Sequence, residues 1–95
     1  MAAAWSKRLF GDSHFLHVAN AISVGAEELD ALELRDALQL SQSAVRRVLI
    51  DLEAVSLLER LERPSRTARQ RYRRAAHPFW AATAALYGTA AERDE

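Results

Sequence analysis

Two stretches of helical periodicity follow each other so closely that the chain must turn sharply between them. Apolar residues recur at helical spacing over residues 29–40 and again from Gln42 to about Val55. A turn of only two or three residues would join the two helices, and Ser41 is a suitable N-cap for the second one. The pattern therefore predicts two helices joined by a tight turn. The start of the first helix is left open, because a short extended segment around residues 28–31 also fits the sequence.

The second of these helices has an apolar stripe and a polar face. The residues of the stripe are predicted to face the core: Val45, Val48, Leu49, Leu52 and Val55. Helical geometry places five others off the stripe, mostly on one exposed face: Gln42, Ser43, Arg46, Arg47 and Ile50. Two arginines on an exposed face are, in most proteins, simply solvated. The sequence around the helix must decide whether this face binds anything.

Two short strands are predicted after the second helix, because the apolar period changes there. The strands are residues 57–62 and 69–73, and a turn at residues 64–67 joins them. A two-stranded hairpin is not stable by itself, so we expect it to lie on the helices. Its inward side chains are predicted to be Leu58, Leu61 and Tyr72.

Further helices are predicted on both sides of this central region. Residues 13–23 have helical spacing, with Ser13 as a cap and Gly25 as the end. Pro78 suits the first position of a last helix, and Gly88 suits its end. The segment 1–12 is richer in apolar groups than a tail should be, and residues 91–95 are expected to be frayed. The fold class is therefore mainly α with a small β-hairpin.

Length and composition limit what such a chain can be. Its 95 residues make one small domain, which is marginally stable alone and would gain from a partner subunit. It has no cysteine, which excludes disulfides, thiolate catalysis and cysteine-ligated zinc. The N-terminus does not have the pattern of a signal peptide, and no apolar run has the length of a membrane span. We expect a soluble, cytoplasmic protein without a membrane partner.

The formal net charge of zero hides an uneven distribution. Residues 41–74 hold nine arginines and four acidic residues, a net charge of +5, and the remainder carries −5. Such a molecule can present its basic part to a polyanion. All but one of the basic residues are arginine, the better residue for bidentate contacts with phosphate and guanine.

Other kinds of site have less support. His14 and His17 have a metal-compatible spacing, and His77 could join them, but a histidine pair on a helix is more often structural. The acidic pair at residues 27–28 suits a helix start better than acid–base catalysis. No nucleophile motif, glycine-rich phosphate loop or metalloprotease signature is present. We expect no enzyme activity, no catalytic residue, no cofactor and no metal.

The order of helix, helix, polar-faced helix and basic hairpin resembles the winged helix-turn-helix of bacterial transcriptional regulators, above all the ArsR-like and MarR-like groups. The resemblance lies in LRDALQLSQSAVRRVLIDLEAVSLLERL, residues 34–61, and in RPSRTARQRYRR, residues 63–74. It covers roughly 60 to 80 residues when the first helix is counted. The chain departs from the family pattern at Ile50 and Asp51, where family members often carry a basic residue. The chain also has none of the cysteines of the metal-sensing members, and no attached ligand-binding domain is expected.

The resemblance implies a winged helix-turn-helix domain over residues 13–76, with a three-helix core, a two-stranded wing and an extra terminal helix. Its function would be that of a sequence-specific regulator of transcription, most simply a dimeric repressor that binds double-stranded DNA. Residues 42–55 would enter the major groove, and residues 63–71 would contact the flanking minor groove or backbone. The implied DNA-binding residues are Ser41, Gln42, Ser43, Arg46, Arg47, Arg63, Arg66, Arg69 and Arg71.

The resemblance also implies a homodimer, because family members usually dimerise through elements that flank the motif. Residues 1–12 and 77–90 are the candidate segments. Their interface residues would be Trp5, Leu9, Phe10, Phe79, Trp80, Leu86 and Tyr87, although some of these side chains should fill the domain's own core. An effector, either a small molecule or a protein, is left open. The alternative function is a protein-interaction module of the same fold that never touches DNA.

Overall fold

The computed structural model describes residues 2–93, which form five helices and three short strands. These residues pack into two compact units. The helical unit consists of residues 2–25 and 77–93, and the mixed unit is Ala26–Ala76. The chain is therefore mainly helical with a small antiparallel sheet, which confirms the fold class at that level. None of the helices in residues 2–93 has the length and apolar character needed to cross a bilayer.

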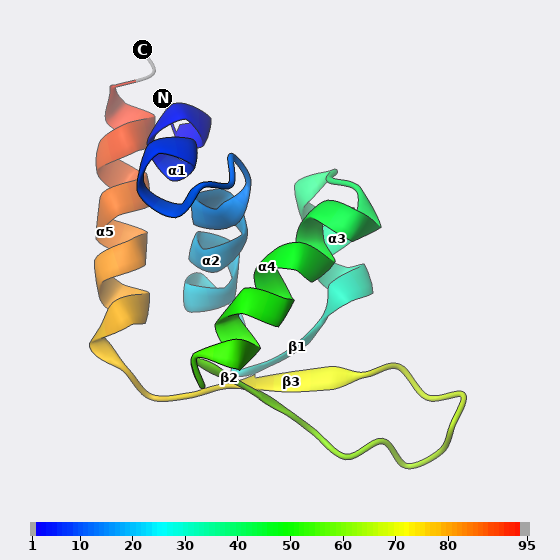
Figure 1. The fold of residues 1–95 in the computed structure, drawn as a ribbon. Helices are drawn as coiled ribbons and strands as arrows, with labels where there is room; N and C mark the ends of the chain where they lie inside the picture. The colour runs from blue at the N-terminus through cyan, green and yellow to red at the C-terminus, as the bar shows by residue number, and fades with distance from the viewer. Residues whose placement is uncertain (1, 94–95) are drawn as a thin grey trace. The chain divides into compact units, whose positions relative to one another are not determined.

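The helical unit contains α1 (Ala2–Phe10), α2 (Phe15–Val24) and α5 (Pro78–Glu92). Helix α2 packs against both of the others (Figure 1). It therefore buries residues on more than one face: Phe15, Leu16, Val18, Ala19 and Ile22. Ser6 of α1 is also buried, and its hydroxyl accepts a hydrogen bond from Leu16 N at 2.8 Å and donates one to Asp12 O. This hydroxyl holds the turn between α1 and α2.

The ends of α2 agree with the sequence prediction at one side only. Gly25 occupies the C-cap, as predicted. Ser13 as the N-cap is wrong, because the helix begins at Phe15 and its N-cap position is His14, whose side chain makes no capping bond. The Asp12 carboxylate accepts instead from His14 N at 2.8 Å. The side chain that accepts a backbone hydrogen bond there belongs to Asp12, three residues before the helix, and not to the expected serine.

Helix α5 begins as predicted and ends later. Pro78 stands in its first turn, and His77 Nδ1 accepts from Phe79 N at 2.9 Å. An end at Gly88 is wrong, because the helix continues to Glu92. Ala90 is fully buried and its neighbours favour helix, so packing carries the last turn past the glycine. Of the expected frayed tail, residues 91 and 92 are helical, and residues 94 and 95 lie outside the described residues.

The mixed unit contains β1 (Glu28–Asp30), α3 (Ala31–Leu38), α4 (Gln42–Ala54), β2 (Leu58–Arg60) and β3 (Arg71–Arg74). The predicted hairpin is present as β2 and β3, with both strands shorter than expected. Strand β3 is central, because β1 pairs with its other edge and Asp30 lies opposite Arg71 (Figure 1). The extended alternative for residues 28–31 is therefore confirmed, and a helix beginning at Leu29 is wrong.

Helix α4 follows α3 after a turn of three residues. Gln39 adopts the left-handed conformation with φ of 56°, which ends α3. Ser41 caps α4 as predicted, and its hydroxyl accepts from Ala44 N at 3.2 Å. Four of the five stripe residues are buried: Val45, Val48, Leu49 and Leu52. Val55 is wrong as a core residue, because α4 ends at Ala54 and the Val55 side chain is 64% exposed.

Two of the three side chains predicted to face inward from the hairpin are buried. Leu58 and Tyr72 are buried, as predicted. Leu61 is only half-buried, because β2 ends at Arg60 and the chain leaves the sheet there. The predicted turn is present, with Ala68 N donating to Ser65 O at 3.3 Å.

Candidate nucleic-acid interface

The solvent-facing side of α4 carries the polar residues that the sequence singled out. Because the apolar stripe is buried, its opposite side is left to solvent, and four predicted site residues are exposed there: Gln42, Ser43, Arg46 and Arg47. Ser41 is exposed as well, and its hydroxyl lies 3.3 Å from that of Ser43. One helix therefore brings these five side chains together.

The loop between β2 and β3, residues 61–70, carries three more of the predicted residues: Arg63, Arg66 and Arg69. The loop extends away from the sheet (Figure 1). Gln70 closes its base, because the side-chain amide donates to Leu61 O at 2.6 Å and to Arg71 O at 2.9 Å. All three arginines are exposed, so this loop presents cations on a base that is fixed to the sheet.

Asp30 is a buried carboxylate that holds two of these arginines. Its side chain is 3% exposed, and it lies 3.5 Å from the guanidinium groups of both Arg69 and Arg71. It also caps α3 by accepting from Glu33 N at 2.9 Å. Burial acts to raise the pKa of Asp30, but the hydrogen bond from Glu33 and the charge of Arg69 together lower that pKa below its ordinary value. Asp30 therefore stays ionised. From its position on β1 it links the first turn of α3 to Arg71 of β3 and to Arg69 of the loop.

Two arginines of β3, Arg71 and Arg73, have acidic neighbours in their own sheet or beside it. Arg71 pairs with Glu33 at 3.2 Å and lies 3.8 Å from Glu28, and Arg73 lies 3.4 Å from Glu28. By contrast, three predicted site residues make no ion pair within residues 2–93: Arg46, Arg63 and Arg66. The interface thus has an ion-paired part on the sheet and an uncompensated part on α4 and the loop.

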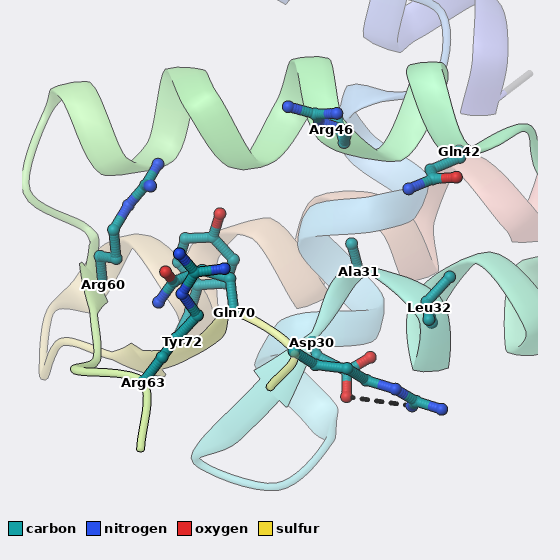
Figure 2. Close-up of a pocket in the computed structure, with 10 residues that line it drawn as sticks. Asp30, Ala31, Leu32, Gln42, Arg46, Arg60, Arg63, Gln70 and Tyr72 are labelled. Carbon is teal, nitrogen blue, oxygen red and sulfur yellow. Dashed lines mark hydrogen bonds and ion pairs between the residues drawn. The ribbon is translucent and has the colours of Figure 1, made fainter. Parts of the chain in front are cut away.

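A hollow of about 360 Å³ opens beside the exposed face of α4; we call it the basic groove. Four arginines line it, namely Arg46, Arg60, Arg63 and Arg69. The rest of its lining comes from Gln42, Gln70, Tyr72 and residues 30–32. Figure 2 shows Gln42 and Arg46 on the α4 side, with Tyr72 and Gln70 across from them. The groove therefore lies wholly within the mixed unit.

Arg60 forms one end of the basic groove. Its guanidinium group lies over the Tyr72 ring, 5.8 Å from the ring centroid, and makes two hydrogen bonds of 3.0 Å to Glu53. The hydrogen bond to Glu53 is the main reason why the pKa of Arg60 is raised, and it lowers the pKa of Glu53. The tyrosine hydroxyl points toward α4 (Figure 2). Arg60 is thus fixed in place and its charge is matched.

The sequence reasoning did not assign Arg60, Gln70 and Asp30 to the site. A usable signal existed for Arg60, because alternation along β2 puts it on the face of Leu58, and it lies opposite Tyr72 in the sheet. No local signal existed for Asp30, because its partners Arg69 and Arg71 follow it by about 40 residues. Such a pairing depends on strand register, which the sequence left uncertain.

The residues predicted for a dimer interface lie in the helical unit, and most of them pack inside it. Trp80 is buried, at 5% exposure. Ring contacts join Phe79 to Phe15 at 6.4 Å and Phe10 to Phe15 at 4.4 Å between centroids. Three of the other four, Trp5, Leu86 and Tyr87, are half-buried. These contacts favour the alternative that much of this group fills the chain's own core.

Leu9 differs from the rest of that group, because it is 59% exposed. It lines a shallow hollow on α1 together with Ala4, Trp5 and Arg8. Leu9 and Phe10, which is 38% exposed, are the residues of the predicted dimer interface that are open to solvent. The dimer itself stays a prediction.

The histidines of the helical unit form no recognisable ligand set. His17 stacks on Tyr87 with ring centroids 5.5 Å apart. Burial, followed by the proximity of His14, lowers the pKa of His17. His77 uses its Nδ1 to cap α5. Within residues 2–93, no three histidine, aspartate or glutamate side chains are grouped as a metal ion would need.

Comparisons with protein-family models, with curated proteins and with solved structures find no match to this chain. The chemistry of the described residues must therefore carry the functional argument. That chemistry consists of guanidinium and amide groups on one helix face, an arginine-bearing loop and a groove between them.

Proposed function

We propose that the mixed unit is the helix-turn-helix and wing of a winged helix-turn-helix domain that binds double-stranded DNA, and that the chain is a sequence-specific regulator of transcription. The observation that carries this proposal is the exposed face of α4, where Gln42, Ser43, Arg46 and Arg47 stand together beside the arginine loop. The order α3, turn, α4, β2, loop and β3 supports the same reading. Within this proposal α4 is the recognition helix and residues 61–70 are the tip of the wing.

DNA recognition follows from the chemistry of these side chains. The major groove admits a helix, and arginine can pair with O6 and N7 of guanine. Glutamine can pair in the same way with N6 and N7 of adenine, which suits Gln42 in the first turn of α4. Arg63 and Arg66 on the loop would contact the backbone or the adjacent minor groove. Arg69 and Arg71 would contribute less, because a phosphate must compete with Asp30 for them.

A dimer belongs to the same proposal, because a repressor of two-fold operators needs two copies of this helix. The exposed Leu9 and the half-buried Trp5 on α1 support a contact through the helical unit. Sedimentation velocity over a wide concentration range tests it. We expect a mass that rises toward the dimer, and Leu9→Asp should shift the equilibrium toward monomer. A monomer mass at every concentration would remove the dimer from the proposal.

The DNA-binding function is tested with a labelled pool of random duplex DNA and fluorescence anisotropy. We expect binding that weakens steeply between low and moderate salt, because phosphate contacts release counterions. Arg46→Ala/Arg47→Ala should weaken it by at least about tenfold. Lys7→Ala/Arg8→Ala is the matched control, because it removes the same charge from α1. We expect that control to change the affinity by less than about threefold.

Two results would contradict the proposal. One is an equal loss of affinity in the two variants, which would mean that only net charge matters. The other is a lack of binding by the unchanged protein even at low salt. If the protein does bind, selection from the same pool gives the operator sequence and tests whether binding is specific.

A protein-interaction module is the second candidate function, and the end of α4 favours it. Ile50 is 55% exposed and Val55 is 64% exposed, and large apolar side chains at such positions suit a protein surface better than a phosphate backbone. Failure of DNA binding at low salt would support this candidate. In that case Ile50→Asp should abolish capture of the protein partner, while Arg46→Ala/Arg47→Ala retains part of it.

A further inference from the structure

The four arginines of the basic groove differ in whether their charge is already matched. Arg60 is held by two 3.0 Å hydrogen bonds to Glu53, and Arg69 lies 3.5 Å from Asp30. The other two, Arg46 and Arg63, make no ion pair within residues 2–93. They lie on different walls, because Arg46 comes from α4 and Arg63 from the loop after β2 (Figure 2). The groove thus has two uncompensated positive charges that face one hollow.

We propose that the basic groove binds a phosphate group, which Arg46 and Arg63 hold from its two sides. Two unmatched guanidinium groups match the charge of a phosphate monoester, or of two successive diester phosphates. The volume of about 360 Å³ lies in the range of sites for small ligands and leaves room for the group that bears the phosphate. Gln42 adds an amide that can donate to a further oxygen.

The geometry of the walls favours phosphate over other anions. A carboxylate has two oxygens in one plane, whereas phosphate oxygens point in several directions and can accept from two opposite walls at once. The one carboxylate in the groove, Asp30, does not oppose the anion, because its charge is matched by Arg69 and Arg71. Gln70 is also engaged, since its amide nitrogen donates to two backbone carbonyls. The donors that remain for a ligand therefore include those of Arg46, Arg63 and Gln42, together with the Tyr72 hydroxyl.

The phosphate can come from two sources, the backbone of DNA or a small free molecule. For DNA, this proposal rests on the proposed DNA-binding function; for a free phosphate monoester it stands without that function. A free phosphate would also regulate DNA binding, because it occupies Arg46 and Gln42, which the DNA proposal assigns to base contacts. The two ligands would then exclude each other.

Neighbouring arginines provide matched controls for an experiment on the full chain. Arg47 follows Arg46 on α4, and Arg66 follows Arg63 on the loop, but neither lines the basic groove. The groove pair Arg46→Ala/Arg63→Ala and the control pair Arg47→Ala/Arg66→Ala remove the same charge from the same two elements. All four side chains are exposed, so both variants should fold, and circular dichroism checks this. If the groove pair does not fold, Arg46→Gln/Arg63→Gln replaces it.

The first arm titrates inorganic phosphate into the protein at constant ionic strength, with amide chemical shifts as the readout. We expect saturable shifts at Gln42 and at residues 61–63. The groove pair should lose at least about tenfold in affinity, because each charged hydrogen bond to phosphate contributes at least that factor. The control pair should lose less than about threefold. The second arm measures the groove pair against the random duplex, with and without inorganic phosphate; its control is Lys7→Ala/Arg8→Ala, because the proposed DNA interface includes Arg47 and Arg66.

The outcomes distinguish failure of the phosphate site from failure of the proposed DNA-binding function. A selective loss by the groove pair in the phosphate arm alone supports a free phosphate ligand, and the DNA-binding function fails separately if the unchanged protein does not bind the duplex at low salt. A selective loss in the duplex arm alone, together with a shallower salt dependence, supports backbone phosphate as the ligand, because loss of a base contact would leave the salt dependence unchanged. A selective loss in both, with competition between the ligands, supports regulation. Two results overturn the proposal. One is a loss of affinity in the groove pair that is no larger than in the control variant, in every arm where the unchanged protein binds. The other is a lack of binding by the unchanged protein in both arms.

Discussion

The helical unit and the mixed unit divide the chemistry of the chain between them. Residues 1–25 and 77–95 hold six of the seven aromatic residues, with three basic and four acidic side chains. Residues 26–76 hold one aromatic residue, Tyr72, with ten basic and nine acidic side chains. One unit therefore packs through rings and the other is tied together by charges. Because basic and acidic residues are nearly equal in number in the mixed unit, its basic surface results from where the arginines lie and not from an excess of arginines.

This difference shows how a small unit can present cations without becoming unstable. In the mixed unit, acidic residues of β1 and α3 match two arginines of β3: Glu28, Asp30 and Glu33 lie within ion-pair distance of Arg71, and Glu28 also lies near Arg73. The arginines of α4 and the loop have few such neighbours, and Arg46, Arg63 and Arg66 make no ion pair within residues 2–93. Charge is thus largely matched on the sheet, and the exposed faces of α4 and the loop remain basic. The helical unit offers little charge for a polyanion.

The largest effect that would test this comparison is the loss of an aromatic side chain from the helical unit. Trp80→Ala should lower the free energy of unfolding by about 3–5 kcal/mol, because it leaves a cavity at a buried position. Chemical denaturation measures the change. Leu9→Ala is the control, and at an exposed position it should cost less than about 0.5 kcal/mol. A loss below about 1 kcal/mol for Trp80→Ala would show that ring packing does not hold this unit together.

An intermediate effect should appear at the two helix caps of the mixed unit. Asp30→Ala and Ser41→Ala each remove an N-cap acceptor, which costs about 1–2 kcal/mol in the free energy of unfolding. Asp30→Ala should be the more costly, because it also leaves Arg69 and Arg71 without their shared carboxylate.

The pH dependence separates these two caps. The pKa of Asp30 is lowered in the folded state, so its unfolded form binds a proton at a higher pH. Its stabilising contribution is therefore complete above about pH 4, its unfolded pKa, and is lost as pH falls through the lowered folded value. Denaturation curves between pH 7 and pH 2 should show the Asp30→Ala deficit shrinking, while the Ser41→Ala deficit stays constant. A constant deficit for both variants would contradict the role given to Asp30.

The smallest effect concerns the exposed ion pair of Glu53 and Arg60. Glu53→Gln should lower the free energy of unfolding by less than about 1 kcal/mol at low salt, and by almost nothing at high salt, because salt screens exposed pairs. Glu62→Gln changes the net charge equally, but Glu62 makes no ion pair within residues 2–93. Denaturation at both salt concentrations compares the two variants. If the two variants change the free energy of unfolding equally at each salt concentration, the ion pair contributes nothing to stability.

The parts of the fold that could be predicted are those determined by neighbouring residues. Helix α4 has a capping serine and four correctly spaced core residues, and all of that information lies within about a dozen positions. Strand β1 could only be offered as an alternative, because three extended residues become a strand only when β3 pairs with them. The end of α5 was misjudged for a similar reason, since burial of Ala90 outweighs the helix-ending tendency of Gly88.

The candidate site shows the same division. Gln42, Ser43, Arg46 and Arg47 follow from the helical period of α4 once its buried stripe is known. The groove does not follow, because it needs the register that sets Arg60 opposite Tyr72 and Asp30 opposite Arg71. Only three-dimensional placement distinguishes Arg63, which lines the groove, from Arg66, which does not.

The helical unit is discontinuous in the chain, and this arrangement implies an order of synthesis and folding. Helix α2 must wait for α5, which the ribosome makes only after the whole of Ala26–Ala76. The mixed unit is continuous and has all of its strands once Arg74 has emerged. During synthesis at about 5–20 residues per second, we therefore expect the middle of the chain to fold before its beginning. The newly made α1 and α2 would expose Phe15 and Ile22 for seconds, so the first part of the chain to be made would be the last to be protected from aggregation.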